Sequence, residues 1–287
     1  MNKIKIISLV KICAFTVFLG RAYQFYFFGA PFRAILWDES LLTPLVEGIS
    51  NYSWYDYATS ATVNKWIDGF TKFCSFIFLA AAVISLFWNK IYYEKLKKII
   101  FALALFILLL YGICVVKDSN YDVLQFFELS MQYIAPILLF VNPEKLKNNK
   151  VVLAIKISIV LTFIPHGLYA MGLIYVPGHF IDMTIILLGV NETQATSFLF
   201  VVGLLDVIMS ILIFIPQVSK YALIYMIIWG FITALARIVA GFNQNFLVYS
   251  IHTSAYLTVF RLAHGLVPLI ALKLEKEKLI KIAQNEN

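Results

Sequence analysis

Residues 197–242 read SFLFVVGLLDVIMSILIFIPQVSKYALIYMIIWGFITALARIVAGF, two apolar runs joined by a few polar residues. Each run is about 20 residues long, the length that an α-helix needs to cross about 30 Å of hydrocarbon. Asp206 lies inside the first run and Arg237 inside the second. The stretch therefore predicts a pair of transmembrane helices, each with an ionisable side chain in its apolar part.

The whole chain repeats this pattern. Of its 287 residues 61% are hydrophobic and only 14% are charged, and the mean hydropathy is +0.85, whereas soluble domains carry about 25% charged residues. We predict an all-α protein, a polytopic transmembrane helical bundle of about eight spans that contacts the lipid bilayer. The expected spans are 4–20, 70–88, 99–116, 124–141, 151–170, 197–216, 221–242 and 254–272.

The basic residues predict the orientation. With the N-terminus inside, the cytoplasmic ends of the spans carry 14 lysines, whereas the external connections hold five basic residues, Arg21, Arg33, Lys65, Lys72 and Lys117. Lysine and arginine are enriched in cytoplasmic loops, so we expect a multi-pass protein of the cell (inner) membrane with both termini in the cytoplasm. The charge of +7 arises from these loop residues and not from a basic arm, so no nucleic-acid partner is expected.

Two external connections are long, residues 21–69 and 171–196. The first is rich in aromatic residues, which favour the headgroup level of a membrane, so we expect it to lie on or dip into the outer leaflet. Each connection follows the first span of a half, 1–150 or 151–287. This shared order suggests two parallel four-helix repeats, although sequence identity between the halves is negligible.

Ionisable residues within or beside the spans are the candidate site. A charged side chain inside a bilayer costs roughly 2.5–3.5 kcal/mol on insertion scales, so it normally faces a partner or a cavity. By the expected topology these groups occupy one layer, from the midplane to the outer surface. The candidate ligand-binding residues are His166, Asp206, Arg237, Arg261 and Glu128, joined from the first loop by Arg21 and Arg33.

Two interpretations of this layer remain open. In the first, Asp206 pairs with Arg237 or Arg261 and locks the helices together. In the second, two arginines that face one aspartate leave a surplus positive charge, which is balanced by Glu128 or by a bound anion, a carboxylate or a quinone oxygen. Arg33 is either part of a loop salt bridge near Asp38 and Glu39 or part of a lid over an outward cavity.

Motifs of soluble enzymes are not found. The sequence has no phosphate-binding Gly-rich loop, HExxH, CxxC or nucleophile elbow, and His179, Asp182 and Glu192 match no metal-ligand spacing. Cys13, Cys74 and Cys114 fall in expected spans and are predicted to be buried apolar residues. We expect no metal site, and the sequence does not decide whether a reaction is catalysed.

Residues 163–216, which begin FIPHGLYAMG and include Gly203 and Asp206, resemble the DoxX family of four-helix membrane proteins. The shared features are a helix that ends in His166 and Gly167 and a later helix that begins Gly-x-x-acidic, with aspartate here where the family usually has glutamate. The first half resembles, by its layout, the transmembrane domains of vitamin K-dependent carboxylases. The spacing of Arg21, Arg33, Asp38 and Glu39 is similar to that of bacterial integral membrane proteins. The resemblance implies four-helix units and quinone-linked or thiol redox chemistry.

These observations leave three functions. The first is binding of a quinone-like, lipidic or anionic small molecule in an outward-facing intramembrane pocket, as in a redox-accessory subunit with a quinone as cofactor. The second is transport of a small anion or amphipathic acid. The third is a non-catalytic scaffold subunit of a membrane complex.

Overall fold

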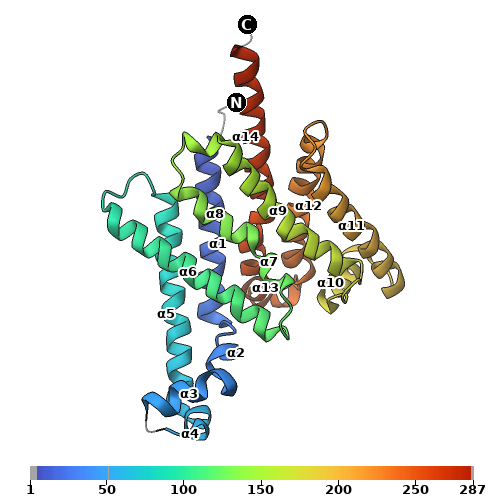
Figure 1. Ribbon diagram of the computed structural model, residues 1–287. Helices are drawn as coiled ribbons and strands as arrows, with labels where there is room; N and C mark the ends of the chain where they lie inside the picture. The colour runs from blue at the N-terminus through green and yellow to red at the C-terminus, as the bar shows by residue number, and fades with distance from the viewer. Residues whose placement is uncertain (1–4, 51, 286–287) are drawn as a thin grey trace.

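The computed structural model describes residues 5–50 and 52–285, and this part of the chain is helical without strands. The chain runs back and forth along one bundle, and its two termini lie at the same end (Figure 1). The helices are α1 (Ile6–Phe27), α2 (Arg33–Leu36), α3 (Glu39–Ile49), α4 (Trp54–Thr59), α5 (Ala61–Leu86), α6 (Glu94–Asp118), α7 (Leu124–Phe127), α8 (Ser130–Phe140), α9 (Asn149–Ala170), α10 (Gly178–Leu188), α11 (Glu192–Leu212), α12 (Ser219–Ala240), α13 (Leu247–Arg261) and α14 (Ala263–Asn285), with short 3-10 helices at Lys145–Lys147 and Gln244–Phe246.

Seven helical segments of the described chain are long and apolar enough to cross a membrane. They are α1, α5, α6, α9, α11, α12 and the run Gln244–Glu277, which includes α13 and most of α14. Their length and composition confirm a multi-pass helical membrane protein in contact with the lipid bilayer. The last expected span, 254–272, is the middle of a longer segment.

The expected span 124–141 is not a continuous helix. It is divided into α7 and α8, neither of which is long enough to cross a membrane. The Met131 amide, in the first turn of α8, donates to Thr162 Oγ1 of α9 at 3.1 Å. A side chain of a neighbouring helix thus satisfies a backbone donor that the interrupted helix leaves without a partner. α8 still lies within the bundle and leads the chain back towards the end that carries the termini (Figure 1).

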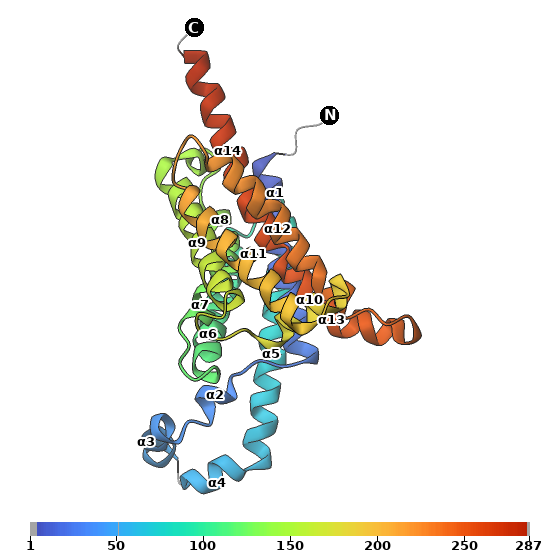
Figure 2. The ribbon, with the colours of Figure 1, turned by 90° about the vertical axis from the view of Figure 1, so that its right-hand side faces the viewer.

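The expected boundaries of the first loop, 21–69, are wrong. α1 continues to Phe27 and α5 begins at Ala61, so Arg21 belongs to a helix. A charged residue at position 21 suggested the end of a span, but Arg21 is only 2% exposed and its charge has partners inside the bundle. The short helices α2, α3 and α4 form a lobe with the first turns of α5 beyond the bundle (Figures 1 and 2).

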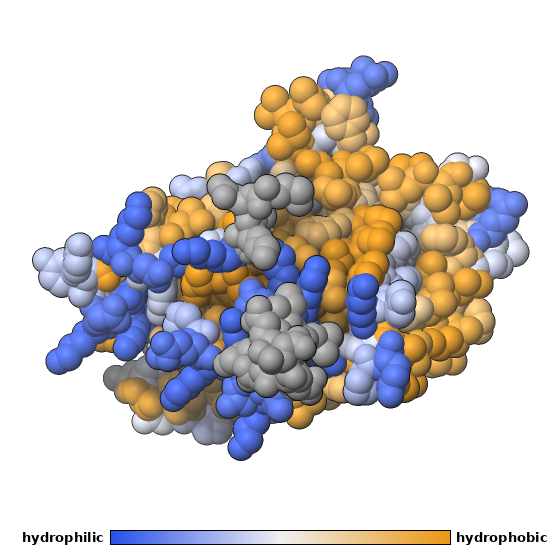
Figure 3. Space-filling model, turned by 90° about the horizontal axis from the view of Figure 1, so that it is seen from above, coloured by the Kyte–Doolittle hydropathy of each residue, from blue (hydrophilic) through white to orange (hydrophobic). Residues whose placement is uncertain are grey.

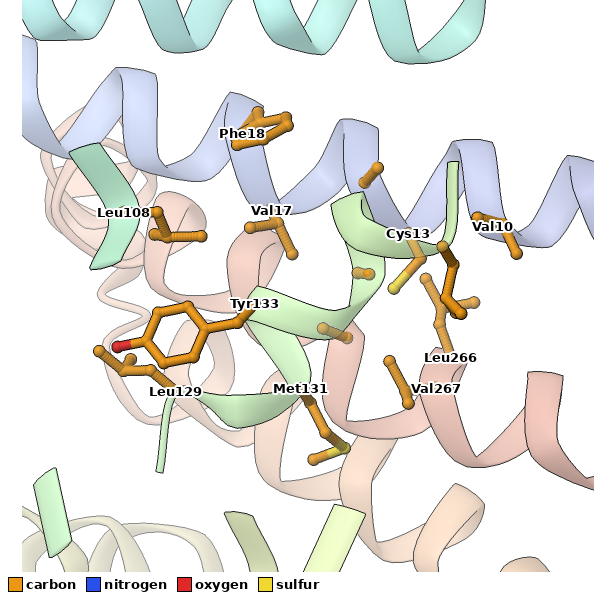
Figure 4. Packing of buried hydrophobic residues seen from close by; sticks show 14 of the residues in the cluster. Val10, Cys13, Val17, Phe18, Leu108, Leu129, Met131, Tyr133, Leu266 and Val267 are labelled. Carbon is orange, nitrogen blue, oxygen red and sulfur yellow. The ribbon is translucent and has the colours of Figure 1, made fainter. Parts of the chain in front are cut away.

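The core forms around α1, which packs against α5, α8, α13 and α14. Figure 4 shows Val10, Cys13 and Val17 on the side of α1 that faces α8 and α14. One cluster of buried apolar residues includes members from 1–150 and from 151–287, so the two halves of the chain share a core. The three cysteines are buried, as expected. The repeat interpretation stays a prediction.

Polar and apolar residues are separated on the surface. Seen from the end with the termini, hydrophilic residues gather around those ends and much of the periphery is apolar (Figure 3). Large apolar side chains also point outward along the long helices, for example Phe73 of α5 (60% exposed), Phe106 of α6 (61%) and Ile211 of α11 (60%). An apolar periphery of this kind is the surface that lipid chains cover.

Candidate functional site

Two close helix crossings position the ionisable side chains. α9 and α11 touch at Gly167 and Gly203, where a Cβ atom on Gly167 would lie 2.6 Å from the Gly203 carbonyl oxygen. α12 and α14 touch at Gly230, where an added Cβ would lie 2.3 Å from the His264 carbonyl oxygen. Small residues allow membrane helices to approach this closely. His166 is adjacent to the first crossing, and His264 belongs to the second.

An apolar cavity of about 170 Å³ lies between α9, α10, α11, α12 and the junction of α13 with α14. We call it the apolar cavity because most of its wall is hydrocarbon. The apolar lining includes Phe163, Phe180, Met183, Leu187, Leu199, Val202, Trp229 and Ile232. The polar lining includes His166, Asp206, Arg237, Arg261 and His264. Four of the predicted site residues therefore line one cavity.

The rim of the apolar cavity lies on the outer surface of the bundle. Leu188 at the end of α10 is 51% exposed, Phe198 of α11 is 37% exposed and Ile232 of α12 is 50% exposed, and all three line the cavity. α11 and α12 are among the segments that are long and apolar enough to cross a membrane. The exposed apolar rim of the cavity thus belongs to α10, α11 and α12.

A second cavity, of about 150 Å³, lies between α1, α6, α7, α8 and α13. We call it the polar cavity because its wall carries Arg21, Gln24, Tyr111, Gln125, Glu128 and Gln132. His166, Arg261 and His264 line both cavities. These three residues form a shared wall with an apolar space on one side and a polar space on the other.

Arg21 is the arginine with a complete set of partners. Its Nε and Nη2 atoms donate to Gln132 Oε1 at 2.9 and 2.6 Å, and its Nη1 atom donates to Gln24 Oε1 at 2.6 Å. The guanidinium also stacks between the rings of Tyr111 and Phe260, at 4.4 and 4.0 Å from their centres. Planar contacts and amide oxygens together hold this charge without a carboxylate.

Arg237 and Arg261 are different. The Arg237 Nε and Arg261 Nη1 atoms are buried and have no hydrogen-bond partner in the described part of the chain. Neither guanidinium has a carboxylate within 4.0 Å among the described residues, and each instead lies near one ring, Phe180 for Arg237 and Phe260 for Arg261. Buried donors are almost always satisfied, so these two atoms are exceptions within the described part of the chain.

Asp206 does not pair with either arginine. Its Oδ1 atom accepts from the Tyr225 hydroxyl at 2.8 Å, and its Oδ2 atom accepts from Trp229 Nε1 at 3.3 Å. Both donors belong to α12, so Asp206 connects α11 to α12. The interpretation that Asp206 neutralises Arg237 or Arg261 is therefore not supported by this geometry.

Glu128 lies at the break between α7 and α8, beside the shared wall. Its Oε1 atom is 3.5 Å from His166 Nδ1, which is also 2.9 Å from the Thr162 carbonyl oxygen. The rings of His166 and His264 are 5.5 Å apart. His264 Nε2 is buried and has no hydrogen-bond partner in the described part of the chain. Glu128, His166 and His264 thus line the same cavity as Arg261.

Arg33 lies outside both cavities. It donates to Asp68 Oδ1 at 2.6 Å and to Asn64 Oδ1 at 2.8 Å, so it joins α2 to α5. The expected loop partner Asp38 instead pairs with Lys117 and caps α3. Arg33 therefore belongs to the lobe, and the structure does not place it as a lid.

Several residues of the site were not predicted as such. Gln132, Tyr225 and Trp229 are uncharged, and helix spacing alone did not identify them as partners of Arg21 and Asp206. His264 was recognisable, since it lies one turn from Arg261. Lys156 was also recognisable as a charge within an apolar run, and it binds Glu275, the Ile213 carbonyl oxygen and Ser219 Oγ near the end of the bundle that carries the termini.

In the part of the chain that the structure describes, no group of three or more His, Cys, Asp or Glu side chains could hold a metal ion. The site residues offer hydrogen-bond donors and positive charge instead. No family model, curated protein or solved structure matches this chain.

Proposed function

We propose that this integral membrane protein binds an amphipathic, lipid-like anion with its acidic group at Arg237 and Arg261 and its hydrocarbon part in the apolar cavity. The observation that carries the proposal is the pair of buried guanidinium atoms without a hydrogen-bond partner, Arg237 Nε and Arg261 Nη1, which belong to two residues that line a cavity with a hydrocarbon wall. An ionised acceptor forms the strongest hydrogen bonds with such donors.

Formal charge supports an anion. Three arginines and two carboxylates are among the described residues that line the two cavities, so one positive charge is in surplus when the histidines are neutral. A monoanion would balance it. A neutral quinone could accept hydrogen bonds from the same donors but would leave the surplus charge in a membrane interior, where an unbalanced charge is costly. We therefore place a quinone second.

Access from the bilayer supports a lipid-like ligand in preference to a small soluble anion. The exposed apolar rim at Leu188, Phe198 and Ile232 would let a hydrocarbon chain pass sideways between α10, α11 and α12. With both termini in the cytoplasm, as the lysines predict, the cavity lies in the outer half of the membrane.

A transport function has one specific observation in its favour. Lys156, Ser219 and Glu275 connect α9, α12 and α14, three segments that also line the apolar cavity. Lys156 is ten residues before His166 in the sequence, about 15 Å along α9. Lys156 thus holds α9 to α12 and α14 near one end, and the apolar cavity lies between α9 and α12 further along α9, as in a carrier closed on one side.

The resemblance of residues 163–216 to the DoxX family stays a prediction. Gly167, Gly203 and Asp206, which carry it, cluster at the crossing of α9 and α11. The close packing of α9 against α11 requires small residues at positions 167 and 203, and this requirement does not depend on a redox function.

The proposal is tested by extracting and identifying lipids that remain bound to the purified full chain. We expect an acidic amphiphile at near-stoichiometric amount in the natural protein, and a loss of about tenfold or more in Arg237→Gln and Arg261→Gln, because each removes a hydrogen bond to a charged group. Arg33→Gln is the matched control, since it removes an arginine that lies outside both cavities, and it should retain the ligand. A bound quinone as the main species, or equal anion content in all variants, would contradict the proposal.

A further inference from the structure

The two cavities present three chemical environments in a fixed order. The apolar cavity offers hydrocarbon, the shared wall offers the guanidinium of Arg261 beside His264, and the polar cavity offers amides and hydroxyls. Arg237 adds a second guanidinium at the apolar side of this wall. A ligand that spans the wall would need a hydrocarbon tail, then a negative group, then a polar group.

The polar cavity is suited to uncharged hydrogen-bonding groups. Gln24, Gln125, Gln132 and the Tyr111 hydroxyl line it, and the positive charge of Arg21 is already engaged by two glutamines and two rings. Glu128 on the same wall would repel a second negative charge. A cationic group would be repelled by Arg21 and Arg261 and attracted only by the carboxylate of Glu128. The polar cavity therefore favours an uncharged group over a cationic or an anionic one.

The polar cavity is large enough for more than a single water, and one of its lining residues, His264, carries an atom that no described residue satisfies. Its volume is about 150 Å³, well above the roughly 15 Å³ that one water requires. His264, only 6% exposed, lines the cavity and has an Nε2 atom without a partner in the described part of the chain. A hydroxyl group can donate to or accept from an imidazole nitrogen in either tautomer.

We propose that the ligand is a phosphodiester lipid with an uncharged, hydroxyl-bearing headgroup. Its acyl chains occupy the apolar cavity, its phosphate lies between Arg237 and Arg261, and its headgroup occupies the polar cavity. A phosphodiester carries the single negative charge that balances the surplus at the two cavities. This inference rests on the proposed function and adds to it a headgroup class and a second subsite.

The test is native mass spectrometry of the full chain in detergent with lipids that share the same acyl chains. The probes are phosphatidylglycerol, phosphatidic acid, phosphatidylethanolamine and the free fatty acid, together with water-soluble glycerophosphoglycerol. We expect phosphatidylglycerol to bind about tenfold more tightly than the other three membrane probes, because two or more hydrogen bonds form in the polar cavity. Equal binding of glycerophosphoglycerol would show that a soluble phosphodiester is recognised and would overturn the lipid assignment.

Val115 provides a variant that fills the polar cavity. Val115→Trp places a large ring in that cavity, which Val115 lines, and should reduce the binding of phosphatidylglycerol to the level of the fatty acid. Val116→Trp is the matched control, because Val116 is the next residue of α6 and lines neither cavity. Gln125→Leu is a second variant of similar volume with the same expected loss of headgroup preference. The Gln125 Nε2 atom donates to the Tyr169 and Tyr175 hydroxyls at 3.1 and 3.4 Å, so thermal unfolding is measured beside binding to show that the variant is folded.

The outcomes separate the two proposals. If Val115→Trp and Gln125→Leu leave the headgroup preference unchanged, or if the natural protein has none, this inference fails while binding of an acidic lipid at Arg237 and Arg261 still stands. If Arg237→Gln and Arg261→Gln retain every acidic lipid, the proposed function fails first and this inference fails with it.

Discussion

Arg237 and Arg261 line the same cavity, and neither has a carboxylate within ion-pair distance in the described part of the chain. A buried charge without a partner lowers the stability of the ligand-free protein. Proteins retain destabilising groups at sites where function depends on them. In such a site, the same residue lowers the stability of the ligand-free protein and binds the ligand. This conflict between stability and binding can be measured.

Without ligand, Arg237→Leu should be more stable than the natural protein. With ligand, it should lose the stabilisation that the natural protein gains. Removal of the unsatisfied donor is expected to raise the free energy of unfolding by about 1–3 kcal/mol, seen as a higher melting temperature after exhaustive lipid removal. Added acidic lipid should raise the melting temperature of the natural protein and leave that of Arg237→Leu unchanged. A lower melting temperature of the variant in the absence of lipid would mean that Arg237 has a structural partner.

Asp206→Asn should have the opposite effect on stability. The side chain accepts from Tyr225 and from Trp229, and an asparagine offers only one acceptor oxygen to these two donors. We expect a loss of about 1–3 kcal/mol, measured as thermal unfolding of the lipid-free protein. Asp182→Asn, at an exposed position of α10, is the control and should change little.

The ionisable members of the site were predictable at the residue scale, whereas their partners were not. Arg237, Arg261, Asp206 and His166 are conspicuous because each interrupts an apolar run, and the structure brings all four to one cavity. Tyr225 and Trp229 are ordinary residues of a membrane helix, so their contact with Asp206 depends on how α12 is rotated against α11. That rotation is set by packing across helices, and spacing along one helix does not reveal it.

At the scale of elements, glycines set how closely the helices pack. Gly167 and Gly203 bring the backbones of α9 and α11 together, while Gly69 on α5 has open space around it. The expected spans 151–170 and 221–242 agree with α9 and α12 to within two residues at both ends. The expected boundaries differ in α1, because Arg21 is buried, and in 124–141, because the chain bends at Glu128 and Leu129. Hydropathy shows that the run 124–141 is apolar. It does not show that a side chain of a neighbouring helix satisfies the backbone where the helix is interrupted.

Gly203→Ala and Gly69→Ala form a matched pair for this scale. The added methyl at 203 would lie 2.6 Å from the Gly167 carbonyl oxygen, and nothing lies within 4 Å of the position at 69. Gly203→Ala should separate α9 from α11 and lower the melting temperature. Gly69→Ala should be neutral or stabilising by up to about 1 kcal/mol, because alanine favours a helix over glycine. Similar effects of the two changes would show that the crossing is less close than described.

At the scale of the whole molecule, both termini lie at one end of the bundle, the lobe of α2, α3 and α4 lies beyond the other end, and α10 lies in the half away from the termini (Figures 1 and 2). The lysine distribution assigns the termini to the cytoplasm. The shared side of the termini agrees with that assignment, and the direction of insertion stays a prediction from sequence. The site would then face the outer leaflet, where a lipid could be received from the bilayer.

Cysteine labelling in whole cells tests the direction. Cys13, Cys74 and Cys114 are buried, so they give a low background. Tyr55→Cys, at a position of the lobe that is 73% exposed, should react with a membrane-impermeant maleimide in intact cells. Lys276→Cys, at an exposed position of α14, should react only after the cells are permeabilised. The reverse pattern would place the cavity in the inner half of the membrane.

The most direct test of the central claim is a high-resolution experimental map of the full chain purified with native lipid. The account predicts elongated density in the apolar cavity, with acceptor oxygens about 2.7–3.2 Å from Arg237 Nε and Arg261 Nη1. A map in which either guanidinium forms an ion pair with Asp206 or Glu128, and in which only water occupies the cavity, would contradict it.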